Sequence, residues 1–257
     1  MIVDANTWIG HWPFRRVRLA DAAGLGRLLD RTGTGLALVS PLSGPFYRDC
    51  LTAMEEMLED GGWDATRFRP VAVLNPHFPG WQEDLRTMAT SMGCVALRLI
   101  PNYHDYSLYS DEAVAAAQAA TDLGLAVVVT ARMHDERSHH PRMYVPPVPM
   151  EDVRFLMRMV PQARYLLSQV TFPEASSLLS EMDLVADAGW EMSYKPPAFV
   201  VERVVSEIGR ERLLYGSGAV LQYPESLLLP VQQAPIDEPS RQAILGGNAL
   251  RLFGLGD

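Results

Sequence analysis

Residues 93–132 read GCVALRLIPNYHDYSLYSDEAVAAAQAATDLGLAVVVTAR and contain one complete structural repeat. Apolar runs at 95–100 and 126–131 predict two strands, and a continuously apolar run is typical of a strand covered on both faces. Between them, residues 111–123 have helical spacing after a predicted N-cap at Ser110, with Asp111 and Glu112 in the first turn. A strand, a helix and a strand in this order predict a right-handed unit with two parallel strands.

The same alternation extends through the whole chain. Further strands are expected at residues 2–5, 36–40, 71–74, 165–170, 191–194 and 213–216, and further helices at 19–30, 47–59, 81–92, 150–159, 173–186, 198–208 and 239–245. Eight such repeats in about 250 residues are typical of a (β/α)8 barrel, so we predict an α/β protein with a single TIM-barrel domain. An open doubly wound sheet is the alternative, but it carries a glycine-rich phosphate loop after its first strand, where this chain reads DANTWIG.

The composition limits the classes of partner. The chain has 257 residues, of which 48% are hydrophobic, and its 22 basic and 31 acidic side chains give a net charge of −9. An acidic surface disfavours nucleic acid and anionic membranes, and no apolar run approaches the ~18–20 residues of a membrane span. The N-terminus has no signal-peptide pattern, and Cys50 and Cys94 make no disulfide framework. We therefore expect a cytoplasmic protein that acts on a small molecule.

In a barrel of this type, the chemistry lies on the loops that follow the strands. The first of these loops begins near Asn6, and the loops after the fourth and fifth predicted strands cover residues 101–109 and 132–149. Of the six histidines, four lie on these last two loops: His104, His134, His139 and His140. Long loops without secondary structure are often functional, so the predicted site lies at this end of the barrel.

Several stretches resemble the amidohydrolase superfamily, and within it the amidohydrolase-related branch that includes decarboxylases. Residues 1–13 (MIVDANTWIGHWP) are similar to the first strand of that branch, residues 211–218 (ERLLYGSG) to its last strand, and residues 241–253 (RQAILGGNALRLF) to its closing helix. The resemblance spans the chain. It implies a hydrolase that cleaves a C–N or C–O bond of a small carboxylate or carbonyl compound, with non-oxidative decarboxylation as the nearest alternative. Members are often dimers, which leaves a homodimer open.

The resemblance also implies a metal centre, with two histidines on the first strand, one each on the fifth and sixth, and an aspartate on the last. The residues of this chain at those positions are Asn6, Trp8, Thr130, one near Ser168, and Gly218. None of these side chains is a good zinc ligand. We therefore expect neither the usual metal centre nor any cofactor.

Three interpretations of the site remain open. In the first, the catalytic groups are Arg98 and Arg132, which could hold a carboxylate between them, His104 as an acid or base, and Lys195 as an electrostatic or imine-forming group. In the second, a zinc ion has moved to the loop after the fifth strand, where the ligands would be His134, Asp135, Glu136, His139 and His140.

In the third interpretation, the barrel binds a small ligand without catalysis. Its aromatic pocket would be lined by Trp8, Trp12, Tyr103, Tyr106 and Tyr194. For any of the three interpretations, the residues expected to contact the ligand are Asn6, Trp8, Trp12, Tyr103, His139, His140 and Tyr194.

Overall fold

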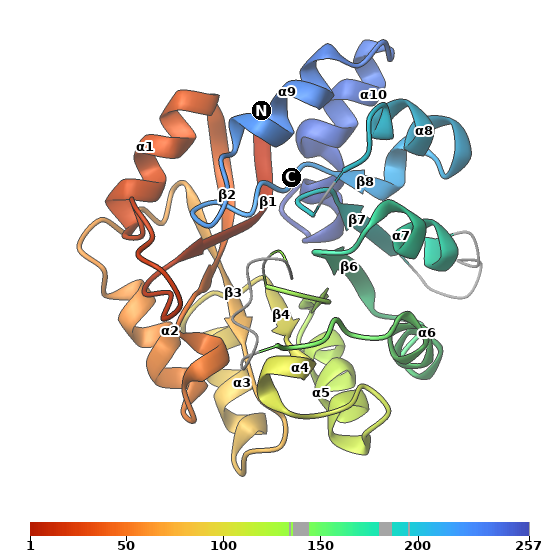
Figure 1. The fold of residues 1–257 in the computed structure, drawn as a ribbon. Coiled ribbons are helices and arrows are strands. Elements are labelled where there is room, and N and C mark those ends of the chain that lie inside the picture. The colour runs from red at the N-terminus through yellow and green to blue at the C-terminus, as the bar shows by residue number, and fades with distance from the viewer. Residues whose placement is uncertain (134, 136–143, 180–186, 195, 257) are drawn as a thin grey trace.

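A computed structural model shows eight parallel strands surrounded by helices (Figure 1). It describes residues 1–133, 135, 144–179, 187–194 and 196–256. The strands are β1 (Ile2–Ile9), β2 (Thr34–Pro41), β3 (Phe68–Val73), β4 (Ala96–Leu99), β5 (Ala126–Thr130), β6 (Arg164–Ser168), β7 (Asp187–Glu191) and β8 (Leu213–Leu214). Each strand pairs in parallel with the next one in sequence, as expected for successive strand–helix repeats.

The helices lie on the outside of the strands (Figure 1). They are α1 (Ala22–Thr32), α2 (Cys50–Leu58), α3 (Trp81–Thr90), α4 (Pro101–His104), α5 (Asp111–Asp122), α6 (Met150–Met159), α7 (Phe172–Leu179), α8 (Val200–Glu207), α9 (Glu225–Gln233), α10 (Glu238–Gln242) and α11 (Asn248–Leu252). A short π-helix, Ala243–Gly247, joins α10 to α11. The predicted single-domain (β/α)8 barrel is thus confirmed.

Backbone hydrogen bonds between the first strand and the chain that follows the last strand close the barrel. The Ala5 amide donates to the Tyr215 carbonyl at 2.9 Å, the Gly218 amide donates to the Asn6 carbonyl at 2.8 Å, and Thr7 forms an isolated bridge with Ala219. The ends of β1 and β8 therefore meet, and side chains from the two ends of the sequence share one face of the barrel.

The interior of the barrel is apolar at its amino end. Small and branched side chains from successive strands, including Ala5, Leu38, Ala96, Val128 and Leu166, form one buried cluster. Helix α11 closes this end, because Ala249, Leu252 and Phe253 pack against the same cluster. The amino end is therefore a packed floor that leaves no room for a ligand.

The predicted and observed elements differ in several places. Strand β1 continues to Ile9 instead of ending at residue 5, strand β7 lies at 187–191 instead of 191–194, and helices α4 and α9 were not predicted. The predicted helix at 239–245 continues through the π-helix into α11. Within the described part of the chain, no helix combines the length and apolar character needed to cross a membrane.

Candidate functional site

The inward-facing positions of five strands change from small or apolar to polar at the carboxyl end of the barrel. Residues two apart on a strand share a face. The residues two positions after the interior positions 38, 96, 128, 166 and 189 therefore point inward as well. Those residues are Ser40, Arg98, Thr130, Ser168 and Glu191, and all are fully or almost fully buried. With Asn6 of β1 they form what we call the polar ring.

Arg98 is the basic member of the polar ring. Its Nε donates to Ser40 Oγ at 2.9 Å, and its Nη1 donates to Thr130 Oγ1 at 2.9 Å and lies 3.4 Å from Ser168 Oγ. The Trp8 ring lies 4.3 Å from the guanidinium carbon, a cation–π contact. Nη2 is buried and has no hydrogen-bond partner among the described residues. One pair of N–H donors is therefore left for another group.

Glu191 is the acidic member of the polar ring, and four donors surround its carboxylate. Oε1 accepts from Ser168 Oγ at 2.7 Å, the Gln169 amide at 2.8 Å and Asn6 Nδ2 at 3.0 Å, and Oε2 accepts from the Ser193 amide at 2.7 Å. Burial raises the pKa of Glu191, and the bonds from Ser193, Ser168 and Gln169 oppose this. Three of the four donors are N–H groups that cannot accept, so the geometry suits the ionised form.

Asn6 and Asp4 of β1 lie beside Glu191. Because Asn6 Nδ2 donates to the carboxylate of Glu191, its Oδ1 is the free end of the amide and has no partner in the described parts of the chain. Asp4 Oδ1 accepts from the amides of Asn6 at 3.2 Å and Ser217 at 2.9 Å. Burial raises the pKa of Asp4 to about 7, opposed by the bonds from Ser217 and Asn6.

Arg132, at the end of β5, is bound to a carboxylate of the protein itself. Its Nη1 and Nη2 donate to the two oxygens of Glu174 in α7 at 2.9 and 2.8 Å, and Nη1 also donates to the Gln169 carbonyl. The Tyr194 ring lies 4.6 Å from the guanidinium carbon. The structure therefore does not place Arg98 and Arg132 as two free halves of one carboxylate clamp, and substrate binding by Arg132 and Tyr194 stays a prediction.

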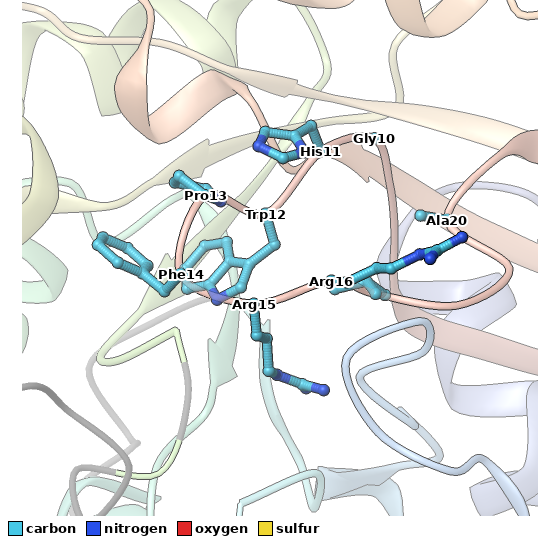
Figure 2. Close-up of a pocket in the computed structure, with 9 residues that line it drawn as sticks. Gly10, His11, Trp12, Pro13, Phe14, Arg15, Arg16 and Ala20 are labelled. Carbon is cyan, nitrogen blue, oxygen red and sulfur yellow. The ribbon is translucent and has the colours of Figure 1, made fainter.

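The aromatic side chains predicted near the mouth divide into two groups. Trp8 covers Arg98, whereas Trp12 and Tyr103 pack with Phe14 and Phe46, whose rings lie 5.3 and 5.4 Å from Trp12. Residues 10–17 and Ala20 line a cavity of about 270 Å³ inside the loop after β1 (Figure 2). Arg15 extends from this loop and donates to the Leu221 carbonyl in the chain after β8 at 2.7 Å.

His104, at the end of α4, contacts the neighbouring loops rather than the polar ring. Its Nε2 lies 3.2 Å from the Gly44 carbonyl, its own carbonyl accepts from Asn75 Nδ2, and its ring stacks on Tyr106. Burial lowers its pKa, opposed by backbone hydrogen bonds to Gly44 and Leu74. These contacts anchor the loop after β4, and the predicted acid–base role of His104 stays a prediction.

Several predicted residues lie outside the described part of the chain. They are Lys195, His134, Glu136, His139 and His140. Asp135 is described and half-buried. Among the described residues there is no group of three or more His, Cys, Asp or Glu side chains that could hold a metal.

Glu191 is the functional candidate that the sequence analysis did not identify. The pattern contains a signal, because Glu191 is the only acidic residue in the run from Ala188 to Tyr194 and stands two positions after an inward-facing glycine. The strand was predicted to start at 191, so Glu191 was taken as its first residue instead of its last. A correct register would have placed it beside Ser168.

Solved structures with the same fold come from decarboxylases and hydrolases. The 5-carboxyvanillate decarboxylase of Sphingomonas paucimobilis matches with a TM-score of 0.71 and 13% identity over 98% of both chains. The enzyme of the same name from Novosphingobium aromaticivorans matches with a TM-score of 0.71 and 10% identity, over 99% of this chain and 96% of that one. A probable 2-pyrone-4,6-dicarboxylic acid hydrolase of Acinetobacter baumannii, with citric acid bound, gives 0.66 and 14% over 98% and 99%. No family model and no curated protein matches the sequence.

The comparison corrects our expectation that no cofactor is involved. The Novosphingobium aromaticivorans decarboxylase was crystallised with manganese, so proteins of this fold do bind a divalent metal and the expectation does not stand. We therefore tested whether the residues at the metal positions of the resembled family fit such an ion.

The described residues at these positions do not fit a divalent cation. Thr130 Oγ1 already accepts from Arg98 Nη1, and Ser168 Oγ lies 3.4 Å from the same Nη1. The positive charge of Arg98 therefore lies beside both hydroxyls and repels a cation. At Gly218, whose φ is +69°, a Cβ atom would lie 2.9 Å from Gln222 Nε2 and 3.3 Å from Gln169 Nε2. Glycine has no side-chain ligand, and the positive φ disfavours an aspartate at this position, so no step proposed below runs through a metal.

The polar ring lies at the end of the barrel where enzymes of this architecture carry their active sites. The fold implied by the sequence resemblance is confirmed: the chain has the same single-domain (β/α)8 barrel as these decarboxylases and this probable hydrolase.

Proposed function

We propose that the protein is an enzyme that binds a small carboxylate or carbonyl compound at the polar ring and hydrolyses a C–N or C–O bond in it. One observation carries the proposal: the fully buried guanidinium of Arg98 has neutral hydroxyls on its other nitrogens and no acceptor for Nη2 among the described residues. A buried donor without an acceptor costs about 1–3 kcal/mol, and an oxygen of the substrate would recover it.

The chemistry of Arg98 supports an oxygen ligand. A fixed guanidinium away from water binds an oxyanion more strongly than the same group in solution, and it stabilises negative charge that develops on a carbonyl oxygen during hydrolysis. The free Oδ1 of Asn6 supports its predicted role in substrate binding, because it can accept a hydrogen bond from a ligand or an attacking water. Asn6 and Arg98 also lie close together, because Glu191 and Ser168 connect them: Asn6 and Ser168 both donate to Glu191 Oε1, and Ser168 lies beside Arg98.

Decarboxylation is the second candidate reaction. It is favoured by the two 5-carboxyvanillate decarboxylases with the same fold, and it also requires a carboxylate held in a fixed position. The two reactions differ in their products, because hydrolysis consumes water whereas decarboxylation releases CO2 without consuming water.

The proposal is tested first by binding. Small carboxylates, amides and lactones are screened by thermal shift on the wild type, on Arg98→Gln and on Arg203→Gln, whose arginine is exposed and pairs with Glu207 at 3.0 Å. We expect shifts with carboxylates that Arg203→Gln keeps and Arg98→Gln loses. Shifts of equal size in Arg98→Gln would refute Arg98 as the binding group.

Compounds that bind are then followed by NMR for turnover. A hydrolysed product would support the proposed hydrolysis. Release of CO2 would instead identify the reaction as decarboxylation. Binding without either product would show that the barrel is a ligand-binding protein and not an enzyme.

A further inference from the structure

The two arginines at the mouth are neutralised in different ways. Arg132 meets Glu174 directly, with both carboxylate oxygens within 2.9 Å of its terminal nitrogens. Arg98 is more deeply buried, yet no carboxylate of the described residues lies within the 4.0 Å of an ion pair. A cation away from water needs a compensating charge, so the source of that charge must lie farther away.

Glu191 supplies the compensating negative charge, and the hydroxyl of Ser168 lies between its carboxylate and Arg98. The hydroxyl of Ser168 donates to Glu191 Oε1 at 2.7 Å, and Arg98 Nη1 lies 3.4 Å from that hydroxyl oxygen, Ser168 Oγ. The carboxylate therefore acts on the guanidinium through space and through one polarised hydroxyl. Because there is no direct contact, Glu191 does not use the donors of Arg98.

Glu191 is also held rigidly in this place. Donors from β1, β6 and the chain after β7 fix both of its oxygens, and Gly216 leaves the space that its side chain fills. A Cβ atom at Gly216 would lie 2.8 Å from Glu191 Cβ. The separation from Arg98 is thus set by the barrel and does not depend on a flexible rotamer.

We propose that Glu191 is a positioning residue of the binding site: it compensates the charge of Arg98 across Ser168 while the site is empty and leaves Nη2 available for the carboxylate of a ligand. The inference rests on the proposed binding of carboxylates at Arg98. When the ligand binds, its negative charge joins that of Glu191 near one guanidinium, so Glu191 limits the affinity and favours release.

This arrangement predicts an effect that a purely structural glutamate would not have. Neutralising Glu191 leaves Arg98 uncompensated in the empty site, so the variant loses stability, but an added anion can replace the missing charge. Acetate is therefore expected to stabilise Glu191→Gln more than the wild type and to bind it at least about tenfold more tightly, because the repulsion from Glu191 is gone.

The experiment compares acetate with acetamide, its neutral analogue, at constant ionic strength. Dissociation constants are measured by calorimetry, and melting temperatures are measured for the wild type, Glu191→Gln, Glu191→Asp and Glu207→Gln. The charge-conserving Glu191→Asp is expected to bind acetate as the wild type does, and Glu207→Gln, which neutralises the partner of the exposed Arg203, to leave acetate affinity unchanged. Acetamide carries no charge, so it is expected to bind the wild type and Glu191→Gln equally.

An acetate shift in Glu191→Gln that is equal to or smaller than that of the wild type would overturn the proposal. If Glu191→Gln does not fold, the double variant Arg98→Gln/Glu191→Gln decides. Recovery of folded protein shows that the uncompensated guanidinium was the cause, and failure of the double variant as well assigns Glu191 a purely structural role.

The inference and the proposed function can fail separately. Tighter acetate binding in Glu191→Gln without turnover of any screened compound supports the charge compensation and refutes the enzyme. Turnover that depends on Arg98, together with unchanged acetate affinity in Glu191→Gln, supports the enzyme and refutes the role of Glu191.

Discussion

Gly216 decides whether the polar ring can form. It has no side chain, and a Cβ atom in its place would lie 2.9 Å from Glu191 Oε2 and 3.2 Å from Asn6 Cβ. We expect Gly216→Ala to displace Glu191 and to lower the free energy of unfolding by about 1–3 kcal/mol, measured by urea denaturation.

A matched control is Gly26→Ala in α1, where a Cβ atom would meet nothing within 4 Å. Alanine favours a helix over glycine, so this variant is expected to gain about 0.5–1 kcal/mol. Equal effects of the two substitutions would contradict the crowding at Gly216.

Asp4 makes stability depend on pH. Burial raises its folded-state pKa from 3.8 to about 7, so the folded protein keeps a proton that the unfolded chain releases over this range. Its contribution to stability is full below pH 3.8 and is lost as the pH rises to about 7.

We therefore expect Asp4→Asn to reduce the fall in stability with rising pH by up to about 1.4 kcal/mol per pH unit. Urea denaturation across this range measures the slope. A slope identical to that of the wild type would show that Asp4 does not titrate in this window.

At the scale of the elements, the pair of Arg132 and Glu174 ties the end of β5 to the first turn of α7. Glu174 also accepts from the amide and hydroxyl of Thr171 at 2.7 and 2.9 Å, so one carboxylate fixes the start of the helix. Glu174→Gln removes the negative charge that pairs with the nearly buried Arg132. We expect the free energy of unfolding to fall by about 1–3 kcal/mol, measured by thermal or urea denaturation. Unchanged stability would show that solvent replaces the pair without cost.

The sequence predicted elements well where apolar runs are long and poorly where they are not. Strands β4 and β5 were predicted within two residues because their runs, VALRLI and AVVVTA, are unambiguous. Strand β7 begins with Asp187, Ala188 and Gly189, which have low strand propensity, and tertiary pairing with β6 imposes the strand there. This shift of register concealed Glu191.

The candidate site was predictable only in part. Arg98 was identified because it lies at the end of the fourth predicted strand, on the side of the barrel where the chemistry is expected. The same logic did not show that Arg132 has its own carboxylate, because Glu174 lies 42 residues away and its helix had to be placed first. The distribution of charge between two arginines is a property of the tertiary structure, not of local sequence.

At the scale of the whole molecule, α11 acts as the floor of the barrel. Leu252 and Phe253 pack against the interior cluster, and Asn248 Nδ2 donates to the Leu213 carbonyl at 2.8 Å. Each large side chain removed from a core costs about 2–5 kcal/mol, out of a total stability of about 5–15 kcal/mol.

A chain that ends at Gly247 is therefore expected to lose its cooperative thermal transition, followed by tryptophan fluorescence and circular dichroism. A chain that ends at Leu255 keeps the helix and its contacts and is expected to unfold as the intact protein does. Cooperative unfolding of the shorter chain would show that the barrel is stable without its floor.

The division between the apolar layers and the polar ring has an evolutionary consequence. Substituting the last inward residue of a strand alters what the mouth recognises, while the tightly packed levels beneath keep their shape. Reactivity and folding thus depend on separate sets of positions. A lineage can replace the first set repeatedly without unfolding, which accounts for barrels that superimpose over nearly their whole length at 10–14% identity.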